Sequence, residues 1–127
     1  MAQFENKQKI STIIFKPKSA CHNLCPLGQL YCDELAKDGS KPILPHYTNN
    51  FTIEFWPNKV IFDYIDIEKW ITRNLNDETL VIEDCVAMLF DYIKKTYEPK
   101  VLRVTSEVND ALHGPVVVTK SSAFLEV

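Results

Sequence analysis

Side chains capable of nucleophilic and proton-transfer chemistry gather in one stretch of the chain: Cys21, His22, Cys25, Cys32 and Asp33. A cysteine thiolate attacks a nitrile or another activated carbon once a neighbouring group lowers its pKa, and a nearby histidine can take its proton. Cys25 is therefore a candidate nucleophile, with His22 as its base. The alternative is that Cys25 is a small buried residue, because free cysteine is among the most buried residue types.

Two glutamates are candidates for holding a flat nitrogen heterocycle. A carboxylate accepts two parallel N–H hydrogen bonds from such a ring, and its charge strengthens both. Glu83 falls near the start of a predicted helix, where the positive end of the helix dipole favours an ionised carboxylate. Glu107 falls near the end of a predicted strand. Each also has a structural explanation, Glu83 as a charge that stabilises the helix start and Glu107 as a solvated edge residue.

Thiols and imidazoles are also the side chains that zinc prefers, and the same part of the chain holds Cys21, Cys25, Cys32, His22 and His46. The spacing of the cysteines does not match a zinc finger or ribbon, so the residues alone predict no metal site. A cytosolic chain of this size needs no disulfides, and we expect free thiols.

The residues that must position these groups follow patterns of strands and helices. Strand patterns rich in β-branched and aromatic residues cover 9–16, 51–56, 101–108 and 116–119. Apolar residues at helical spacing predict one helix that begins at an Asp66 cap and another that runs from a Thr79 cap to about Thr96. Between the first two strands, residues 17–49 are rich in proline, glycine and cysteine, which predicts a long site-forming loop.

The composition predicts a single domain over residues 1–127. Hydrophobic residues make up 46% of the chain and charged residues 24%, which are values typical of folded globular proteins. The net charge of -3 provides no broad positive surface for a phosphate backbone, so we expect a small-molecule partner and no nucleic acid. No apolar run is long enough to span a membrane and no secretory signal is visible, so we expect a cytoplasmic protein.

Helices placed between two pairs of strands predict the α+β class, with a four-stranded antiparallel sheet and both helices on one face. Such a sheet has two open edges, which proteins cover or close into a barrel with neighbouring copies. We therefore expect a homo-oligomer. This element order resembles the tunnelling fold, or T-fold, whose members handle pterins and deazaguanines at subunit interfaces, and the resemblance implies an oligomeric barrel.

Within the T-fold, two segments are similar to the NADPH-dependent 7-cyano-7-deazaguanine reductases, the nitrile reductases of queuosine biosynthesis. Residues 24–29, LCPLGQ, resemble the family segment around its nucleophilic cysteine, and residues 82–86, IEDCV, resemble its His-Glu-Asp-Cys-Val run. The resemblance implies that Cys25 forms a covalent thioimide and that Glu83 holds the substrate. The resemblance also makes Asp33 a candidate for the proton-donating acid, although Asp33 does not stand at the family's position for that residue.

The resemblance to these reductases implies NADPH as the cofactor, but the pattern that marks nicotinamide binding differs. In place of the family's Glu-x-Lys-Ser, the chain has FDYID at residues 62–66, and the Pro-Asp expected after the Gly-Gln pair is absent. These differences keep open the alternative of a non-catalytic T-fold protein that binds or assembles.

A second T-fold group, the 6-pyruvoyl-tetrahydropterin and 6-carboxytetrahydropterin synthases, is similar elsewhere. Residues 19–24, SACHNL, resemble the Ala-x-His-x-Leu that carries their first zinc-binding histidine. This resemblance implies a zinc-dependent lyase in which His22 binds the metal and Glu107 anchors the substrate. The paired zinc histidines of the family fall on Tyr47 and Asn49 here, so the three-histidine site is incomplete.

The leading interpretation is an enzyme that acts on a 7-deazaguanine or pterin-like heterocycle and is most like the nitrile reductases. Its predicted site consists of Cys25, His22 and Asp33 for catalysis, and Glu83 and Glu107 for substrate binding. The zinc-dependent lyase and the non-catalytic protein are the alternatives.

Overall fold

The computed structural model describes residues 7–17, 46–78, 80–110 and 115–122, apart from the side chains of Ser11 and Thr12. These residues form the strands β1 (Gln8–Phe15), β2 (Asn49–Trp56), β3 (Val101–Val108) and β4 (Val116–Ser121), and the helices α2 (Tyr64–Asn74) and α3 (Ile82–Tyr97). The predicted order of strands and helices is confirmed. Neither of the described helices has the length and apolar character needed to cross a membrane.

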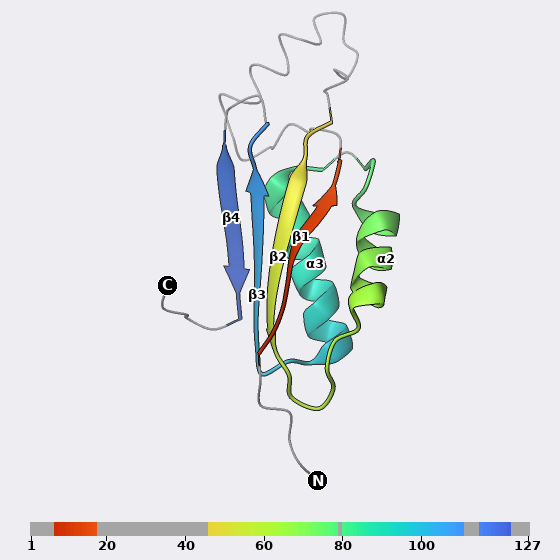
Figure 1. The fold of residues 1–127 in the computed structure, drawn as a ribbon, viewed down its shortest axis with the longest axis vertical. Helices are drawn as coiled ribbons and strands as arrows, with labels where there is room; N and C mark the ends of the chain where they lie inside the picture. The colour runs from red at the N-terminus through yellow and green to blue at the C-terminus, as the bar shows by residue number, and fades with distance from the viewer. Residues whose placement is uncertain (1–6, 18–45, 79, 111–114, 123–127) are drawn as a thin grey trace, which may run out of the picture.

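The strands pair in chain order, β1-β2-β3-β4, and every pair is antiparallel. β2 and β3 pair along their whole length, whereas the pairing of β1 with β2 shifts between Ile10 and Ile13. Figure 1 shows α3 behind the sheet and α2 beside β1. The α+β class is therefore confirmed. The oligomeric barrel stays a prediction, with β1 and β4 at the edges of the described sheet.

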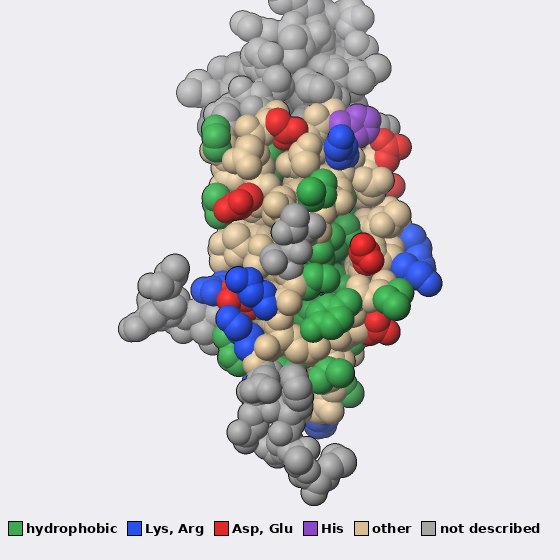
Figure 2. All heavy atoms as spheres, in the orientation of Figure 1, with side chains coloured by type: hydrophobic (Ala, Val, Ile, Leu, Met, Phe, Trp, Pro, Cys, Tyr) green, Lys and Arg blue, Asp and Glu red, His purple; other side chains and the backbone are tan. Residues whose placement is uncertain are grey.

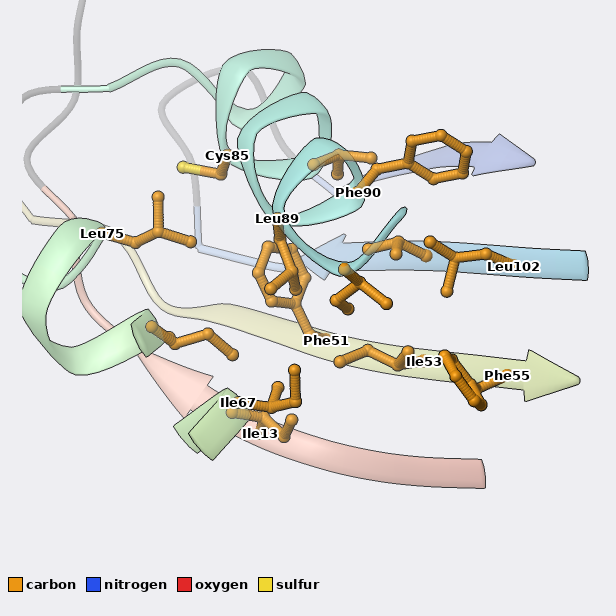
Figure 3. Close-up of a cluster of buried hydrophobic side chains, with 14 of the residues drawn as sticks. Ile13, Phe51, Ile53, Phe55, Ile67, Leu75, Cys85, Leu89, Phe90 and Leu102 are labelled. Atoms are coloured by element: carbon orange, nitrogen blue, oxygen red, sulfur yellow. The ribbon is translucent and has the colours of Figure 1, made fainter. Parts of the chain in front are cut away.

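A hydrophobic core joins the sheet to both helices. The period-two pattern of β2 directs Phe51, Ile53 and Phe55 toward the helices, and all three side chains are fully buried. Figure 3 shows Ile67 of α2 and Leu89 of α3 directed into the same cluster. Burying one large apolar side chain stabilises a fold by about 1.5–3 kcal/mol, so this core holds the helices against the sheet.

A smaller buried group, which we call the second cluster, lies beside the main core, and Val118 packs against both. It consists of Tyr47, Ile82 and Val108, with Val116 and Val118 packed against it. Its members come from the approach to β2, the first residue of α3, the end of β3 and strand β4. The second cluster therefore fixes the start of α3 against one end of the sheet.

The start of α2 differs from the sequence prediction. Asp63, and not Asp66, is the N-cap residue, and its carboxylate accepts hydrogen bonds from the N–H groups of Ile65 and Asp66 at 2.9 and 3.4 Å. Asp66 lies in the first turn, where its carboxylate accepts the hydroxyls of Tyr92 and Tyr97, each at 2.6 Å. Both aspartates suit a helix start, and only the partners on α3 distinguish their roles.

The start of α3 also differs from the prediction, because its N-cap is Val81 and not Thr79. Val81 has no side-chain oxygen, and among the described residues no side-chain hydrogen bond caps the helix. At the other end, Glu98 adopts a left-handed conformation with φ 46°, and its N–H donates to the Lys94 carbonyl at 3.1 Å. The end of α3 is therefore one residue beyond the predicted Thr96.

The face of the sheet opposite the helices carries charged side chains, and Figure 2 shows one group of Lys and Arg side chains there with an acidic side chain among them. Glu54 on this face accepts a hydrogen bond from Lys7 Nζ at 2.9 Å and pairs with Arg103. Burial alone raises the pKa of Glu54, but the bonds from Lys7 and Arg103 bring it below its usual value. These charges are thus paired with one another within the fold.

Candidate functional site

One end of the sheet brings together the flanks of the predicted loop. Phe15, Asn49, Val108 and Val116 pair in a single row across the four described strands. We call this row, together with the start of α3 packed on it, the site end. The described chain stops shortly after Phe15 and resumes shortly before Asn49. The loop that carries the predicted catalytic residues therefore begins and ends at the site end.

Hydrogen bonds hold both flanks of the loop in place. The N–H of Tyr47 donates to the Pro17 carbonyl at 3.0 Å, which ties one flank to the other. The N–H of Asp77 donates to the Lys16 carbonyl at 3.0 Å, and its carboxylate contacts His46 Nε2 at 2.6 Å. The connection between α2 and α3 is therefore joined to both flanks.

Glu83 lies at the site end, in the first turn of α3, and its side chain is exposed. Within the part of the chain that the structure describes, no hydrogen bond or ion pair engages its carboxylate. The helix dipole at this turn favours a negative charge. The Glu83 carboxylate is therefore placed to accept N–H groups from a ligand.

Glu107 also lies at the site end, but on the other face of the sheet. Its neighbours Ser106 and Val108 are buried on the helix side, so Glu107 points to the opposite face, where it is exposed. There it pairs with Asn50 of β2 and Val117 of β4. The carboxylates of Glu83 and Glu107 therefore project from opposite faces of the molecule at the site end.

A buried hydroxyl and a buried thiol lie close to Glu83. Tyr47 Oη donates to the Leu80 carbonyl at 2.6 Å and lies 3.6 Å from Cys85 Sγ. Burial raises the pKa of the Cys85 thiol to about 11, so the thiol stays protonated at neutral pH. Because nucleophilic attack needs the thiolate, Cys85 is a structural residue.

Comparison with known proteins depends on the fold, because no family model and no curated protein matches the chain. An archaeosine synthase QueF-like protein in its apo form aligns over 98% of this chain and 100% of its own, with a TM-score of 0.69 and 12% identity. The E. coli dihydroneopterin aldolase in complex with neopterin aligns over 93% of this chain and 99% of its own, with a TM-score of 0.64 and 11% identity. The chain has the tunnelling fold.

The site end of this tunnelling fold buries polar groups that were not predicted from the sequence. Asn49 and Ser106 are fully buried on the helix side, and the Ser106 hydroxyl donates to Asn49 Oδ1. Asn49 Nδ2 and Asn50 Oδ1 are buried without a partner among the described residues. An unpaired buried polar atom costs about 1–3 kcal/mol, so native proteins keep few of them. The sequence did contain one indication of this buried group. Asn49 is polar but stands two residues before Phe51, so both side chains face the helices.

The predicted catalytic residues of this tunnelling fold, Cys25, His22 and Asp33, lie outside the described residues. Their assembly around a ligand therefore stays a prediction. Among the residues that are described, no three His, Cys, Asp or Glu side chains group as metal ligands. Zinc also stays a prediction, because His22 is not among them, and the described candidate His46 contacts Asp77.

Residues 62–66, which stand in place of the family's nicotinamide-binding pattern, do not provide the side chains that would bind NADPH. Phe62 is buried and stacks edge to face on Tyr64, with ring centroids 5.1 Å apart. Asp63 caps α2 and Asp66 accepts two tyrosine hydroxyls, so both acids are engaged within the fold. No residue of the segment is basic, whereas cofactor phosphates are bound by cations. NADPH as the cofactor stays a prediction, and no hydride-transfer step is assigned to this chain.

Proposed function

We propose that this chain binds a 7-deazaguanine or pterin-like heterocycle at the site end, and that Glu83 is the carboxylate that holds it. The position of Glu83 carries the proposal. Its exposed carboxylate has no partner among the described residues, and it lies at the end of the sheet where both flanks of the predicted loop are tied. Two proteins that share the fold, an archaeosine synthase QueF-like protein and a dihydroneopterin aldolase in complex with neopterin, support this class of ligand.

The proposed recognition uses the edge of the ring. A deazaguanine or a pterin presents adjacent N–H groups along one edge, and an ionised carboxylate accepts two of them in parallel. Hydrogen bonds to a charged group contribute about 1.5–3 kcal/mol, enough to orient the ring in its plane. Glu107 projects from the opposite face of the site end. It could therefore contact a ligand held by Glu83 only if it came from a second copy of the chain, as in the predicted homo-oligomer.

For a heterocycle that bears a nitrile, we propose Cys25 as the nucleophile. The sulfur bonds to the nitrile carbon, one C–N π bond breaks, and His22 carries the thiol proton to the nitrogen, which gives a thioimide. This addition balances without another reactant. Asp33 is the second candidate for the proton transfer. The resemblance of residues 24–29 to the nitrile reductases supports this step.

Intact-mass measurement with 7-cyano-7-deazaguanine tests the covalent step. Because addition has no leaving group, wild-type protein should gain the whole mass of the ligand. Cys25→Ala should lose the adduct, while Cys21→Ala should keep it. Binding without an adduct in the wild type would instead support the non-catalytic alternative.

Calorimetric titration with the same nitrile and with neopterin tests recognition of the heterocycle. Glu83→Gln keeps the shape of the side chain but removes its charge, and it should weaken binding about 10- to 100-fold. Asp84→Asn, in the same helical turn, is the matched control and should change affinity by less than about twofold. The proposal is wrong if wild-type protein binds neither compound, and binding of neopterin alone would favour a pterin as the ligand.

A further inference from the structure

Within the described part of the chain, the first turn of α3 lacks the capping side chain that usually orders a helix start. An N-cap side chain normally accepts a hydrogen bond from the backbone N–H groups of the first turn, which limits fraying. The N-cap here is Val81, which makes no such bond. If Glu83 holds a ligand from this turn, other contacts must fix its position.

Tyr47 provides contacts on both sides of Glu83 in the chain. Its hydroxyl donates to the carbonyl of Leu80, which directly precedes the N-cap, at 2.6 Å. It also lies 3.6 Å from the sulfur of Cys85, in the first turns of the helix. The Tyr47 oxygen therefore contacts both the residue before the N-cap and the first turns of the helix.

Packing holds Tyr47 itself in place. Its side chain is only 4% exposed and packs with Ile82 and Val108 in the second cluster. Its backbone N–H donates to the Pro17 carbonyl at 3.0 Å. Tyr47 is therefore fixed by the sheet and by the first residue of α3 at once.

The charges that face the Tyr47 hydroxyl belong to the same helix start. Burial raises its pKa, and Cys85 and the carboxylates of Glu83 and Asp84 raise it further. The hydroxyl therefore stays a proton donor throughout the neutral range.

We infer that Tyr47 is a positioning residue for Glu83, because its hydroxyl orders the first turn of α3 and so presents the Glu83 carboxylate in one orientation. This inference rests on the proposed function of Glu83 and extends it to a buried residue that touches no ligand. A group that is ordered before binding loses less conformational freedom when the ligand arrives. Removing the hydroxyl should therefore weaken binding even though the carboxylate remains.

Tyr47→Phe removes only the hydroxyl, and Tyr92→Phe is its matched control. Tyr92 also donates a hydroxyl hydrogen bond of 2.6 Å, but its acceptor is Asp66 of α2. Amide hydrogen exchange of the full-length chain without ligand gives the first readout. The amides of Cys85 and Val86 are the first of this helix with an intrahelical acceptor. Tyr47→Phe should speed exchange at these two amides about tenfold, and Tyr92→Phe should not. Equal exchange rates at these residues in the two variants would overturn the inference.

Calorimetric titration with 7-cyano-7-deazaguanine gives the second readout. Tyr47→Phe should weaken binding about tenfold, and Tyr92→Phe should change it by less than about twofold. In a Glu83→Gln background the effect of Tyr47→Phe should disappear, because Tyr47 acts through Glu83. A loss that persists in that background overturns the inference. If wild-type protein binds no heterocycle, the proposed function fails, and hydrogen exchange still decides whether Tyr47 orders the turn.

Discussion

The starts of the two helices use acidic side chains in opposite ways. At α2, Asp63 caps the backbone and Asp66 accepts two tyrosine hydroxyls. At α3, the cap is Val81, and the acidic residues of the first turn, Glu83 and Asp84, are exposed. The helix dipole favours carboxylates at both places, but only those of α2 are engaged by the rest of the described fold.

This difference separates a structural contact from a candidate binding contact. The network at α2 joins the two helices, because the hydroxyls on Asp66 come from α3 and the ring of Tyr92 stacks on Trp70 with centroids 4.8 Å apart. Substitutions there should change stability and leave ligand binding intact. Substitutions at the start of α3 should weaken ligand binding and leave stability nearly unchanged.

The largest loss of stability is expected for Asp66→Ala. This change removes the acceptor of two hydroxyl hydrogen bonds, and it should lower the free energy of unfolding by about 2–3 kcal/mol. Tyr92→Phe removes one of the two bonds and should cost about half as much. Urea unfolding measures both values. A loss below about 0.5 kcal/mol for Asp66→Ala would show that this network does not hold the helices together.

Protonation of Asp66 should produce a smaller effect of the same kind. Hydrogen bonds from Tyr92 and Tyr97 lower the pKa of Asp66 in the folded chain. Since the folded value lies below the unfolded one, this contribution is complete above the ordinary value of 3.8 and is lost as pH falls through the folded value. Thermal melting from about pH 6 to about pH 2 should therefore show a steeper decline for wild type than for Asp66→Asn. Parallel declines would contradict the assignment. Glu54, whose pKa is also lowered, should contribute equally in both proteins.

Loss of the α2 cap should have a moderate effect. Asp63→Ala removes the oxygen that accepts the first-turn N–H groups, so unfolding should become easier by about 1 kcal/mol. Calorimetric titration of the same variant with a heterocycle should match wild type, because Asp63 lies outside the site end. If Asp63→Ala weakened binding and left stability unchanged, the start of α2 would be a binding contact and not a structural one.

The smallest effect on stability is expected for Glu83→Gln. An exposed carboxylate at a helix start contributes about 0.5 kcal/mol through the dipole, and no described partner adds to it. Urea unfolding of this variant should therefore stay close to wild type, while its binding of the heterocycle falls. A loss as large as that of Asp63→Ala would identify Glu83 as a structural residue.

Local patterns predicted the elements of this fold well and their boundaries less well. The alternation that includes Phe51, Ile53 and Phe55 predicted β2 and its buried face, because a strand places every second side chain on one side. The helix starts were placed wrongly, because Asp63 and Asp66 are both acceptable caps in an isolated segment. Their roles depend on tyrosines that lie far along the chain on α3.

The candidate site was predictable only in part. Glu83 was correctly expected near the start of a helix, and Glu107 near the end of a strand. The buried Asn49 with Ser106 was not expected, and neither was the role of Tyr47, because each depends on a partner more than thirty positions away. Periodicity carries no information about such partners.

The sequence by itself determined which residues form strands and helices and which of their faces are apolar, since both follow from neighbours within one or two turns. Only the tertiary structure decided that the ends of four strands and the start of α3 meet at one place, and that Glu83 and Glu107 leave it from opposite faces. The physical reason is that register and packing join residues distant in the chain, and those contacts set the direction of each carboxylate.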